Sequence, residues 1–316
     1  MSPKFEEKLT RLGLEWRSRV LLSTLSHWKI GGPADYVVEP SCAEDVRNAV
    51  KAAEECGIPM FVLGHGSNIL FDDAGFRGVI VRLGGRFCGC AFDGTTVRAQ
   101  AGVWAPALAR ACASRGLSGI EHVVGIPGNI GGLVFMNGGS LRQNIGDVVS
   151  KVTVLARSGD VAEKQQAQCG FSYRHSVFQD DGSIVLGAEL QLTQKSPEEV
   201  RRQMLNILAE RRGKFPLNLP NCGSVFSNDA DLYEQYGPPG MVIDRAGLKG
   251  TRVGDAQVSQ RHANFIVNLG HATSADVFAL VRKIREEILH RTGFTLHCEV
   301  RYLSPGGECG KLDAFL

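Results

Sequence analysis

The sequence lacks long apolar runs and a strong excess of charge. None of its 316 residues belongs to an uninterrupted apolar stretch of about eighteen residues, the length that a membrane-spanning helix requires. The first 14 residues are charged and helical in pattern, unlike a secretion signal. The formal net charge of +2 gives no electrostatic case for a nucleic-acid partner. We therefore predict a cytoplasmic protein with neither a membrane nor a nucleic-acid partner.

Several catalytic signatures are also missing. There is no Gly-x-Ser-x-Gly elbow, no His-Glu-x-x-His and no Asp/His cluster, which disfavours hydrolase chemistry. The nine cysteines form no Cys-x-x-Cys pair, and the closest spacing, Cys88-Gly89-Cys90, suits a zinc site poorly. We therefore expect reduced thiols, most of them in the core, and no metal.

Glycine is abundant, and it gathers in an unusual stretch. In residues 118 to 139, β-branched and large apolar residues separate seven glycines, two of them in Gly125-Ile126-Pro127-Gly128. Glycine lets a ligand approach the main chain closely, while Pro127 fixes one φ and removes one N–H. This pattern is typical of backbone bent around an anionic or aromatic ligand, and the alternative is a set of tight turns between core strands.

A second loop of this kind lies upstream. An apolar run ends in Gly64-His65-Gly66-Ser67-Asn68 and resumes as Ile69-Leu70-Phe71, which predicts strand, sharp turn, strand. Several N–H groups in such a turn can converge on phosphate oxygens. No third glycine opens a helix and no Gly-Lys-Ser/Thr follows, so the loop fits neither the Rossmann nor the Walker pattern. We expect phosphate binding by another fold.

Composition and periodicity predict a globular protein of two or three domains. The hydrophobic content is 43% and the charged content 22%. We expect helices over residues 1 to 20, 43 to 56 (ended by Gly57), 104 to 115, 196 to 212 (capped by Ser196) and from Ser274 to Gly293. Strands are expected at 60 to 63, 78 to 82, 96 to 101, 148 to 156, 183 to 192 and 295 to 302, followed by a loose tail from 304 to 316.

Three later segments carry reactive groups. Tyr173-Arg174-His175 lies beside aromatic bulk, and a surface turn is the alternative. Ser224 follows a glycine at the start of an apolar strand, where a turn serine is the alternative. Glu299 and Arg301 are two apart and would share one face of the last strand, where a local ion pair would contribute under about 1 kcal/mol. Glycine-lined loops with few catalytic charges favour a cofactor that supplies the difficult chemical step.

The motifs together resemble one family. They are Gly31-Gly32-Pro33-Ala34, Gly64-His65-Gly66-Ser67-Asn68, Gly119-Ile120-Glu121, Gly125-Ile126-Pro127-Gly128, Met136-Asn137, Phe171-Ser172-Tyr173-Arg174, Cys222-Gly223-Ser224-Val225-Phe226, Gly247-Leu248-Lys249-Gly250, His262-Ala263-Asn264-Phe265 and Glu299-Val300-Arg301. In this order and spacing, over roughly residues 23 to 303, they resemble UDP-N-acetylmuramate dehydrogenase, also called UDP-N-acetylenolpyruvoylglucosamine reductase, a flavoenzyme family of bacterial peptidoglycan synthesis.

The resemblance implies an α+β fold. A two-subdomain FAD-binding part of the vanillyl-alcohol oxidase type would precede an α+β substrate-binding domain. The expected divisions are an N-terminal helix at 1–22, FAD-binding subdomains at 23–90 and 91–200, the substrate-binding domain at 201–303, and the tail at 304–316. The short run between Leu192 and Phe215 suggests the family's short form, which lacks an extra substrate-covering segment.

The resemblance also implies cofactors and site residues. NADPH would reduce FAD, and the enolpyruvyl ether of a UDP-sugar would then take hydride from flavin N5 at C3 and a proton at C2. Ser224 matches the proton donor, and Arg174 and Glu299 match the pair that stabilises the enolic carboxylate. The residues matching the FAD-binding loops are Gly64, His65, Gly66, Ser67, Asn68, Gly125, Ile126, Pro127, Gly128, Asn129, Gly131 and Gly132.

Tyr173, Lys249 and Asn228 are expected to bind the substrate. The family usually has lysine where this chain has Ser227, and Glu-Pro where it has His297-Cys298. Two other functions stay open from the residues alone: another FAD-dependent oxidoreductase of this fold, and a nucleotide-sugar-binding relative without catalysis. Ser224, Arg174 and Glu299 disfavour the first, because alcohol oxidation needs no acid for a carbanion. The retention of all three residues disfavours the second. The oligomeric state is left open.

Overall fold

A computed structural model describes residues 1–316, and the chain divides into two compact units. Unit 1 comprises Met1–Arg17, Tyr36–His65 and Val79–Arg211, and unit 2 comprises Ser18–Asp35, Gly66–Gly78 and Arg212–Leu316. Each unit is therefore assembled from three separate stretches of sequence.

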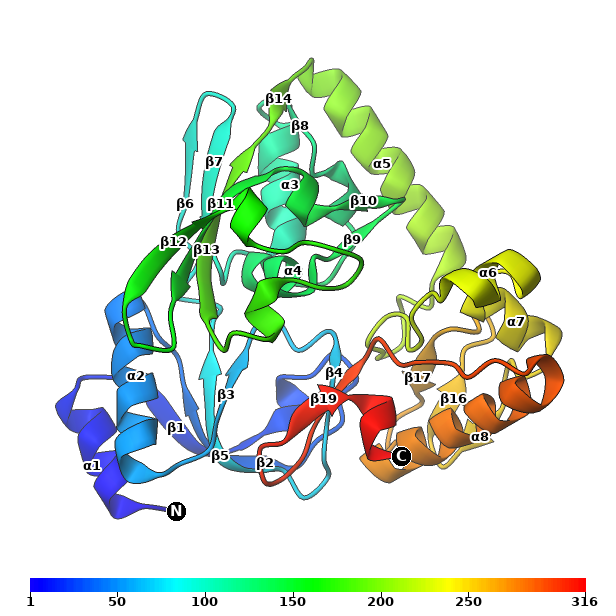
Figure 1. The fold of residues 1–316 in the computed structure, drawn as a ribbon, viewed down its shortest axis with the longest axis horizontal. Coiled ribbons are helices and arrows are strands. Elements are labelled where there is room, and N and C mark those ends of the chain that lie inside the picture. Colours follow the sequence, from blue (N-terminus) through cyan, green and yellow to red (C-terminus); the bar gives the residue numbers. More distant parts are fainter. The chain divides into compact units, whose positions relative to one another are not determined.

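Eight α-helices occur along the chain (Figure 1). They are α1 (Pro3–Arg11), α2 (Ala43–Cys56), α3 (Ala105–Ala113), α4 (Ile130–Met136), α5 (Pro197–Lys214), α6 (Ala230–Tyr236), α7 (Pro239–Arg245) and α8 (Ser274–Thr292).

The strands are mostly short. They are β1 (Trp16–Leu21), β2 (Pro33–Val38), β3 (Met60–Leu63), β4 (Ile69–Phe71), β5 (Phe76–Arg82), β6 (Cys90–Asp93), β7 (Thr96–Gln100), β8 (Leu117–Ser118), β9 (Gly139–Ser140), β10 (Gln143–Asn144), β11 (Val149–Leu155), β12 (Val161–Gln165), β13 (Ile184–Gln191), β14 (Thr193–Gln194), β15 (Arg252–Val253), β16 (Ala256–Val258), β17 (Ile266–Asn268), β18 (Arg301–Leu303) and β19 (Cys309–Lys311).

Unit 1 contains a five-stranded antiparallel sheet in the order β12-β11-β13-β7-β6. On β7 alternate side chains are buried, among them Val97 and Ala99, and β13 buries Ala188 and Leu190. They share one apolar cluster with side chains of α3, α4 and α5. The alternation of apolar and polar residues therefore gives the sheet one core face and one polar face.

A parallel strand pair forms another part of unit 1. Strand β3 pairs with β5 from Met60↔Val79 to Leu63↔Arg82, within a sheet of order β1-β2-β5-β3. Helix α2 connects β2 to β3 and buries Val46 and Ala49. The carboxyl ends of β3 and β5 therefore lie side by side, an arrangement that places the two following loops next to each other.

Unit 2 has a separate apolar core. Helix α8 buries the stripe that periodicity predicted: Val277, Leu280, Val281, Ile284 and Ile288. The same cluster includes residues of the sheets β15-β16-β17 and β19-β18-β4. Strand β18 pairs in parallel with β4, from Arg301↔Ile69 to Leu303↔Phe71.

Several expected elements are confirmed, and others differ. Helix α2 has the predicted bounds and ends at Gly57 in the left-handed conformation. The expected helix over residues 1 to 20 is wrong beyond Arg11, because Gly13 has φ +66° and strand β1 follows. Thr273, rather than Ser274, caps α8. The expected strand at 295 to 302 is reduced to β18.

The residues after β18 are ordered rather than loose. Strand β19 pairs with β18, and a short 3-10 turn (Leu312–Phe315) follows, in which Leu312 is fully buried. The C-terminal residues thus belong to the core of unit 2.

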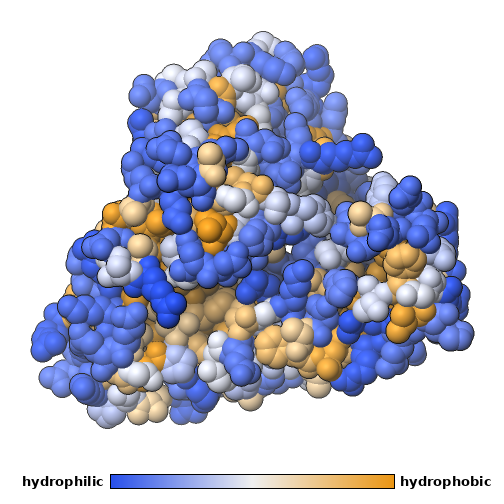
Figure 2. All heavy atoms as spheres, viewed as in Figure 1, coloured by the Kyte–Doolittle hydropathy of each residue, from blue (hydrophilic) through white to orange (hydrophobic).

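Polar side chains cover most of the face seen in Figure 2, with apolar patches between them. None of the eight helices combines the length and the apolar composition that crossing a bilayer would need.

Candidate active site

In unit 1, the carboxyl ends of β3 and β5 meet the start of α4. Leu83 donates its N–H to the Leu63 carbonyl at 2.8 Å, and the Asn129 side-chain amide donates to the Leu83 carbonyl at 2.7 Å. A Cβ built on Gly64 or Gly84 would lie within 3.9 Å of the Asn129 amide nitrogen. Two glycine-containing turns and a buried asparagine therefore gather at the carboxyl ends of parallel strands, where α/β sheets commonly bind ligands.

The glycine-rich segment Gly125 to Gly132, which leads into α4, runs beside residues 101 to 105. Gly128 accepts from the Ala105 N–H at 2.9 Å, and Gly131 donates to the Ala101 carbonyl at 2.8 Å. A Cβ on Gly131 would lie 2.7 Å from the Ala101 Cβ, so this glycine permits close packing. A Cβ on Gly132 would meet nothing within 4 Å. The backbone at Gly132 is therefore accessible to a ligand.

Gly125 has a different constraint. A Cβ there would collide with the side chain of Arg211, which is in the last part of α5. Burial lowers the pKa of the Arg211 guanidinium. The half-buried Arg211 side chain therefore packs against the main chain of the loop Gly125-Ile126-Pro127-Gly128 within unit 1.

The loop after β3 crosses from one unit to the other between His65 and Gly66. In unit 2, Gly66 has φ +67°, and a Cβ there would collide with the Leu25 carbonyl. Asn68 bonds to the last segment of the chain: its amide donates to the Glu299 carbonyl at 3.4 Å, and its carbonyl accepts from the Arg301 N–H at 3.2 Å. The second half of the predicted phosphate loop thus adjoins the backbone of Glu299.

Unit 2 also brings the Ser224 segment against the Glu299 segment. The Glu299 N–H donates to the Val225 carbonyl at 2.8 Å, and Phe226 forms an antiparallel bridge with Cys298. Both Ser224 and Glu299 are half-buried. Two of the three predicted catalytic residues therefore come from neighbouring backbone segments.

Asn264 fixes the Ser224 segment from its other side. Its side-chain oxygen accepts from the Phe226 N–H and its amide donates to the Phe226 carbonyl, both at 2.9 Å. Its backbone carbonyl accepts from the Val225 N–H at 2.9 Å. The side chain is 6% exposed, so these bonds are shielded from water. Gly223, with φ +77°, supplies the turn that begins the segment.

The third predicted catalytic residue, Arg174, lies in unit 1 on a strained turn. Ser172 and His175 form an antiparallel bridge, and Arg174 between them has φ +55°, which is rare for a residue with a side chain. Its guanidinium donates to the Gly139 carbonyl at 3.3 Å and lies 5.3 Å from the ring centre of Tyr173. The strain marks this turn as a functional candidate.

Asn137 holds the Arg174 turn. The Asn137 amide donates to the Ser172 carbonyl at 2.8 Å, and its side-chain oxygen accepts from the Gly146 N–H at 3.0 Å. Asn137 ends α4 with φ +43° and is 4% exposed. A buried left-handed asparagine therefore connects the end of α4 to the Arg174 turn.

The predicted substrate-binding residues differ in their surroundings. Lys249 forms an ion pair with Asp244 at 2.6 Å in unit 2. Asn228 is exposed in unit 2, and Tyr173 is 51% exposed in unit 1. Near Lys249, burial together with the positive charges of Lys214 and Lys249 lowers the pKa of His262 to about 4.

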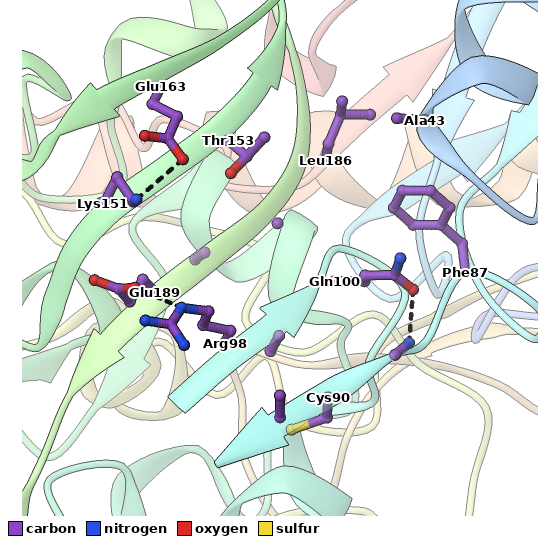
Figure 3. Close-up of a pocket in the computed structure, with 15 residues that line it drawn as sticks. Ala43, Phe87, Cys90, Arg98, Gln100, Lys151, Thr153, Glu163, Leu186 and Glu189 are labelled. Atoms are coloured by element: carbon purple, nitrogen blue, oxygen red, sulfur yellow. Dashed lines mark hydrogen bonds and ion pairs between the residues drawn. The ribbon is translucent and has the colours of Figure 1, made fainter. Parts of the chain in front are cut away.

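A separate hollow of ≈ 510 Å³ lies over the polar face of the five-stranded sheet (Figure 3). Its charged side chains are paired: Lys151 with Glu163 at 3.0 Å and Arg98 with Glu189 at 2.8 Å. None of the predicted site residues lines it. This hollow is distinct from the predicted cofactor loops.

Comparison with known proteins identifies the family. Residues 34–164 match the FAD binding domain family, and residues 215–303 match the C-terminal domain of UDP-N-acetylenolpyruvoylglucosamine reductase. UDP-N-acetylenolpyruvoylglucosamine reductase 1 of Corynebacterium glutamicum is 44% identical over 92% of this chain and 87% of the relative. The chain belongs to the UDP-N-acetylenolpyruvoylglucosamine reductase family.

Other relatives agree. The Rubrobacter xylanophilus reductase is 42% identical over 87% of this chain and 90% of its own length. The crystal structure of the Thermus caldophilus reductase matches with a TM-score of 0.78 and 34% identity, covering 92% of this chain and 98% of the other. The α+β fold with an FAD-binding part of the vanillyl-alcohol oxidase type is confirmed, as is the prediction of an FAD-dependent oxidoreductase.

The residues present fit FAD. Gly132 leaves its main chain open to a bound group, and Gly64 and Gly84 face Asn129 without filling the space beside it. A dinucleotide held by main-chain amides needs such glycines, because any larger side chain would keep its phosphates at a distance. Gly64, Gly84, Asn129 and Gly132 all lie within residues 34–164, which match the FAD binding domain family.

Sequence reasoning gave no role to Asn137, Asn264 or Asp313. Each acts through contacts with residues far away in sequence: 35 positions for Asn137 to Ser172, 38 for Asn264 to Phe226, and 15 for Asp313 to Cys298. Asn137 and Asn264 do stand in motifs of the resemblance, Met136-Asn137 and His262-Ala263-Asn264-Phe265. The position of Asn137 before Gly138-Gly139 was a further signal, because asparagine is favoured in left-handed helix ends.

Proposed function

We propose that the chain reduces UDP-N-acetylglucosamine enolpyruvate to UDP-N-acetylmuramate for peptidoglycan precursors, with NADPH as the electron source. The support for the substrate is family membership over most of the chain. FAD, when bound, would accept hydride from NADPH and deliver it from N5 to C3 of the enolpyruvyl group.

In this proposal, three side chains of the chain stabilise and protonate the substrate. Arg174 neutralises the enolic carboxylate that forms when C3 gains hydride, and Glu299 contributes a hydrogen-bonding acid. The Ser224 hydroxyl donates its proton to C2, and a positioned proton donor typically contributes about 10² to 10⁴ in rate. Serine is a weak acid, but it suffices against a carbon with carbanion character.

One observation supports the proposal that Ser224 and Glu299 act on the same substrate. Their segments are hydrogen-bonded to each other through the 2.8 Å contact between the Glu299 N–H and the Val225 carbonyl. Asn264 and Asn68 hold the two segments by further bonds. A hydroxyl and a carboxylate on a backbone fixed in this way meet the requirement for a preorganised site.

The binding roles follow the same reasoning. We propose that Gly64 to Asn68 hold the FAD diphosphate and that Gly125 to Gly132 wrap the cofactor, supported by the accessible backbone at Gly132. Tyr173, Lys249 and Asn228 would bind the substrate. The functional divisions would be FAD-binding subdomains at 23–90 and 91–200 and a substrate-binding domain at 201–303. We also propose that the enzyme works in the cytoplasm.

The test separates the two half-reactions. The Ser224→Ala variant should still let NADPH bleach the flavin, while the enolpyruvyl substrate should reoxidise it at least about 100-fold more slowly, because only the second step needs the proton. Ser227→Ala is the matched control, since Ser227 lies in the same segment and its hydroxyl bonds to the His297 carbonyl. Wild-type reoxidation by Ser224→Ala, measured by stopped-flow absorbance, would refute the role of Ser224.

A further inference from the structure

We propose that the C-terminal residues 309–316 position Glu299, with Asp313 as the positioning residue. The proposal rests on the role proposed above for Glu299 and adds a device that holds its backbone in place. All of the contacts that support it lie within unit 2.

Asp313 fixes the two residues that directly precede Glu299. One carboxylate oxygen of Asp313 accepts from the Cys298 N–H at 3.0 Å, and the other lies 3.2 Å from Nδ1 of His297. The Asp313 side chain is 10% exposed, whereas His297 is 58% exposed. The bond to the Cys298 N–H is therefore the shielded one, and it acts on the main chain rather than on a mobile side chain.

This contact complements the bonds to the Ser224 segment. In an extended chain, successive backbone groups point to opposite edges. The His297 carbonyl and the Glu299 N–H face the Ser224 segment, where they bond to Ser227 and Val225 at 2.9 and 2.8 Å. The intervening Cys298 N–H faces the other edge, where Asp313 accepts from it. The backbone at Glu299 is thus held from both edges.

The C-terminal residues also hold the chain after Glu299. The Leu312 N–H donates to the Val300 carbonyl at 3.0 Å, and β19 continues the pairing along β18 from Arg301↔Lys311 to Leu303↔Cys309. Glu299 therefore lies between two backbone contacts made by the same short segment.

The segment is itself anchored in the core. Leu312 is fully buried, and the rings of Tyr302 and Phe315 pack edge to face with centres 4.9 Å apart. A Cβ on Gly310 would lie 3.2 Å from the Phe315 ring, so that ring is close to the β19 main chain. Because this packing does not depend on the Asp313 carboxylate, removing the carboxylate should release residues 297 to 299 while leaving the segment folded.

The first test compares half-reactions in the full-length FAD-loaded enzyme. Asp313→Ala should slow flavin reoxidation by the enolpyruvyl substrate about 10- to 100-fold through kcat, because small displacements of a catalytic group have effects of that size. Reduction by NADPH and the KM for substrate should change less than about twofold. Asp313→Asn keeps an oxygen that can accept from the Cys298 N–H and should restore most of the rate. Glu287→Ala, which removes an exposed ion pair on α8, is the control for losing a carboxylate.

A double-mutant cycle distinguishes positioning from a general loss of structure. If Asp313 acts through Glu299, Asp313→Ala should add less than about twofold to the defect of Glu299→Gln. Hydrogen exchange at the Glu299 amide, measured without substrate, should be faster in Asp313→Ala than in the wild type. Should Asp313→Ala not fold, Asp313→Ser, whose hydroxyl is too short to reach, replaces it with the same expectations.

Three results would overturn the proposal: wild-type reoxidation by the Asp313 variant, equal slowing of both half-reactions, or full additivity with Glu299→Gln. The proposed function has its own test. If Glu299→Gln reoxidises at the wild-type rate, the role of Glu299 fails. If Glu299→Gln is slow and Asp313→Ala is not, only the positioning role fails.

Discussion

Replacing Asn137 by alanine should loosen the Arg174 turn. The change removes the acceptor of the buried Gly146 N–H and the donor to the Ser172 carbonyl. The first loss should cost about 1–3 kcal/mol, and the second, at a more exposed carbonyl, about 0.5–1 kcal/mol. Alanine at φ +43° adds about 1 kcal/mol. We expect a total of about 2.5–5 kcal/mol and a melting temperature lower by roughly 10 °C.

Two further substitutions at this position separate the causes. Asn137→Gly avoids the conformational strain of alanine but restores neither hydrogen bond. It should therefore be about 1 kcal/mol more stable than Asn137→Ala. Asn137→Asp keeps the acceptor for the Gly146 N–H and should lose only about 1–2 kcal/mol. This order of stability, aspartate above glycine above alanine, follows from the contacts and not from side-chain size.

The same substitutions should also change the reaction rate. Because Asn137 acts on the turn that carries Arg174, Asn137→Gly should slow flavin reoxidation by the enolpyruvyl substrate about 10-fold or more, with NADPH reduction preserved. Thermal unfolding by circular dichroism and stopped-flow absorbance provide the two measurements. If the melting temperature of Asn137→Ala is within 2 °C of the wild-type value, the loss of stability is no more than roughly 1 kcal/mol. The hydrogen-bonding argument is then wrong.

Three other outcomes follow from the structure. Gly132→Ala should weaken FAD binding without lowering the stability of the apoprotein, as measured by fluorescence titration with FAD. Gly131→Ala should instead destabilise the apoprotein by about 1–3 kcal/mol through its clash with Ala101, as measured by thermal melting of the apoprotein. His262 has a pKa of about 4 in the folded protein, below its unfolded value. Its contribution to stability is therefore present above about pH 6.5 and is lost as the pH falls toward 4. His262→Gln should flatten this part of the curve of unfolding free energy against pH, measured by urea unfolding. Burial raises the pKa of the Cys222 thiol to about 12, so Cys222 should resist an aromatic disulfide reagent until the protein unfolds, and labelling of Cys222 at the rate of exposed Cys42 would contradict this.

Local patterns predicted the elements that local physics controls. The apolar spacing and Gly57 were sufficient for α2, and the stripe from Val277 to Ile288 for the core face of α8. The helix expected over residues 1 to 20 ends early because Gly13 adopts a left-handed conformation and β1 forms by pairing with β2.

The site was accessible from sequence only in part. The resemblance supplied the candidate residues Ser224 and Glu299, and the pairing of their segments follows from hydrogen bonds across more than 70 residues. The ordered C-terminal residues could not be anticipated, because the partners that hold Leu312 and Phe315 are brought to them by the fold. Contacts of this kind leave no periodic trace in the local sequence.

The parallel pairing of β4 with β18 has a consequence for biosynthesis. Residues Ile69 to Phe71 leave the ribosome long before their partners at Arg301 to Leu303 are translated. Until then, an apolar strand edge in the nascent chain has no permanent partner, a condition that favours misassociation and chaperone binding. Synthesis of this protein should therefore depend on chaperone capacity, and stop codons just before residue 301 should yield insoluble product despite retaining most of the polypeptide.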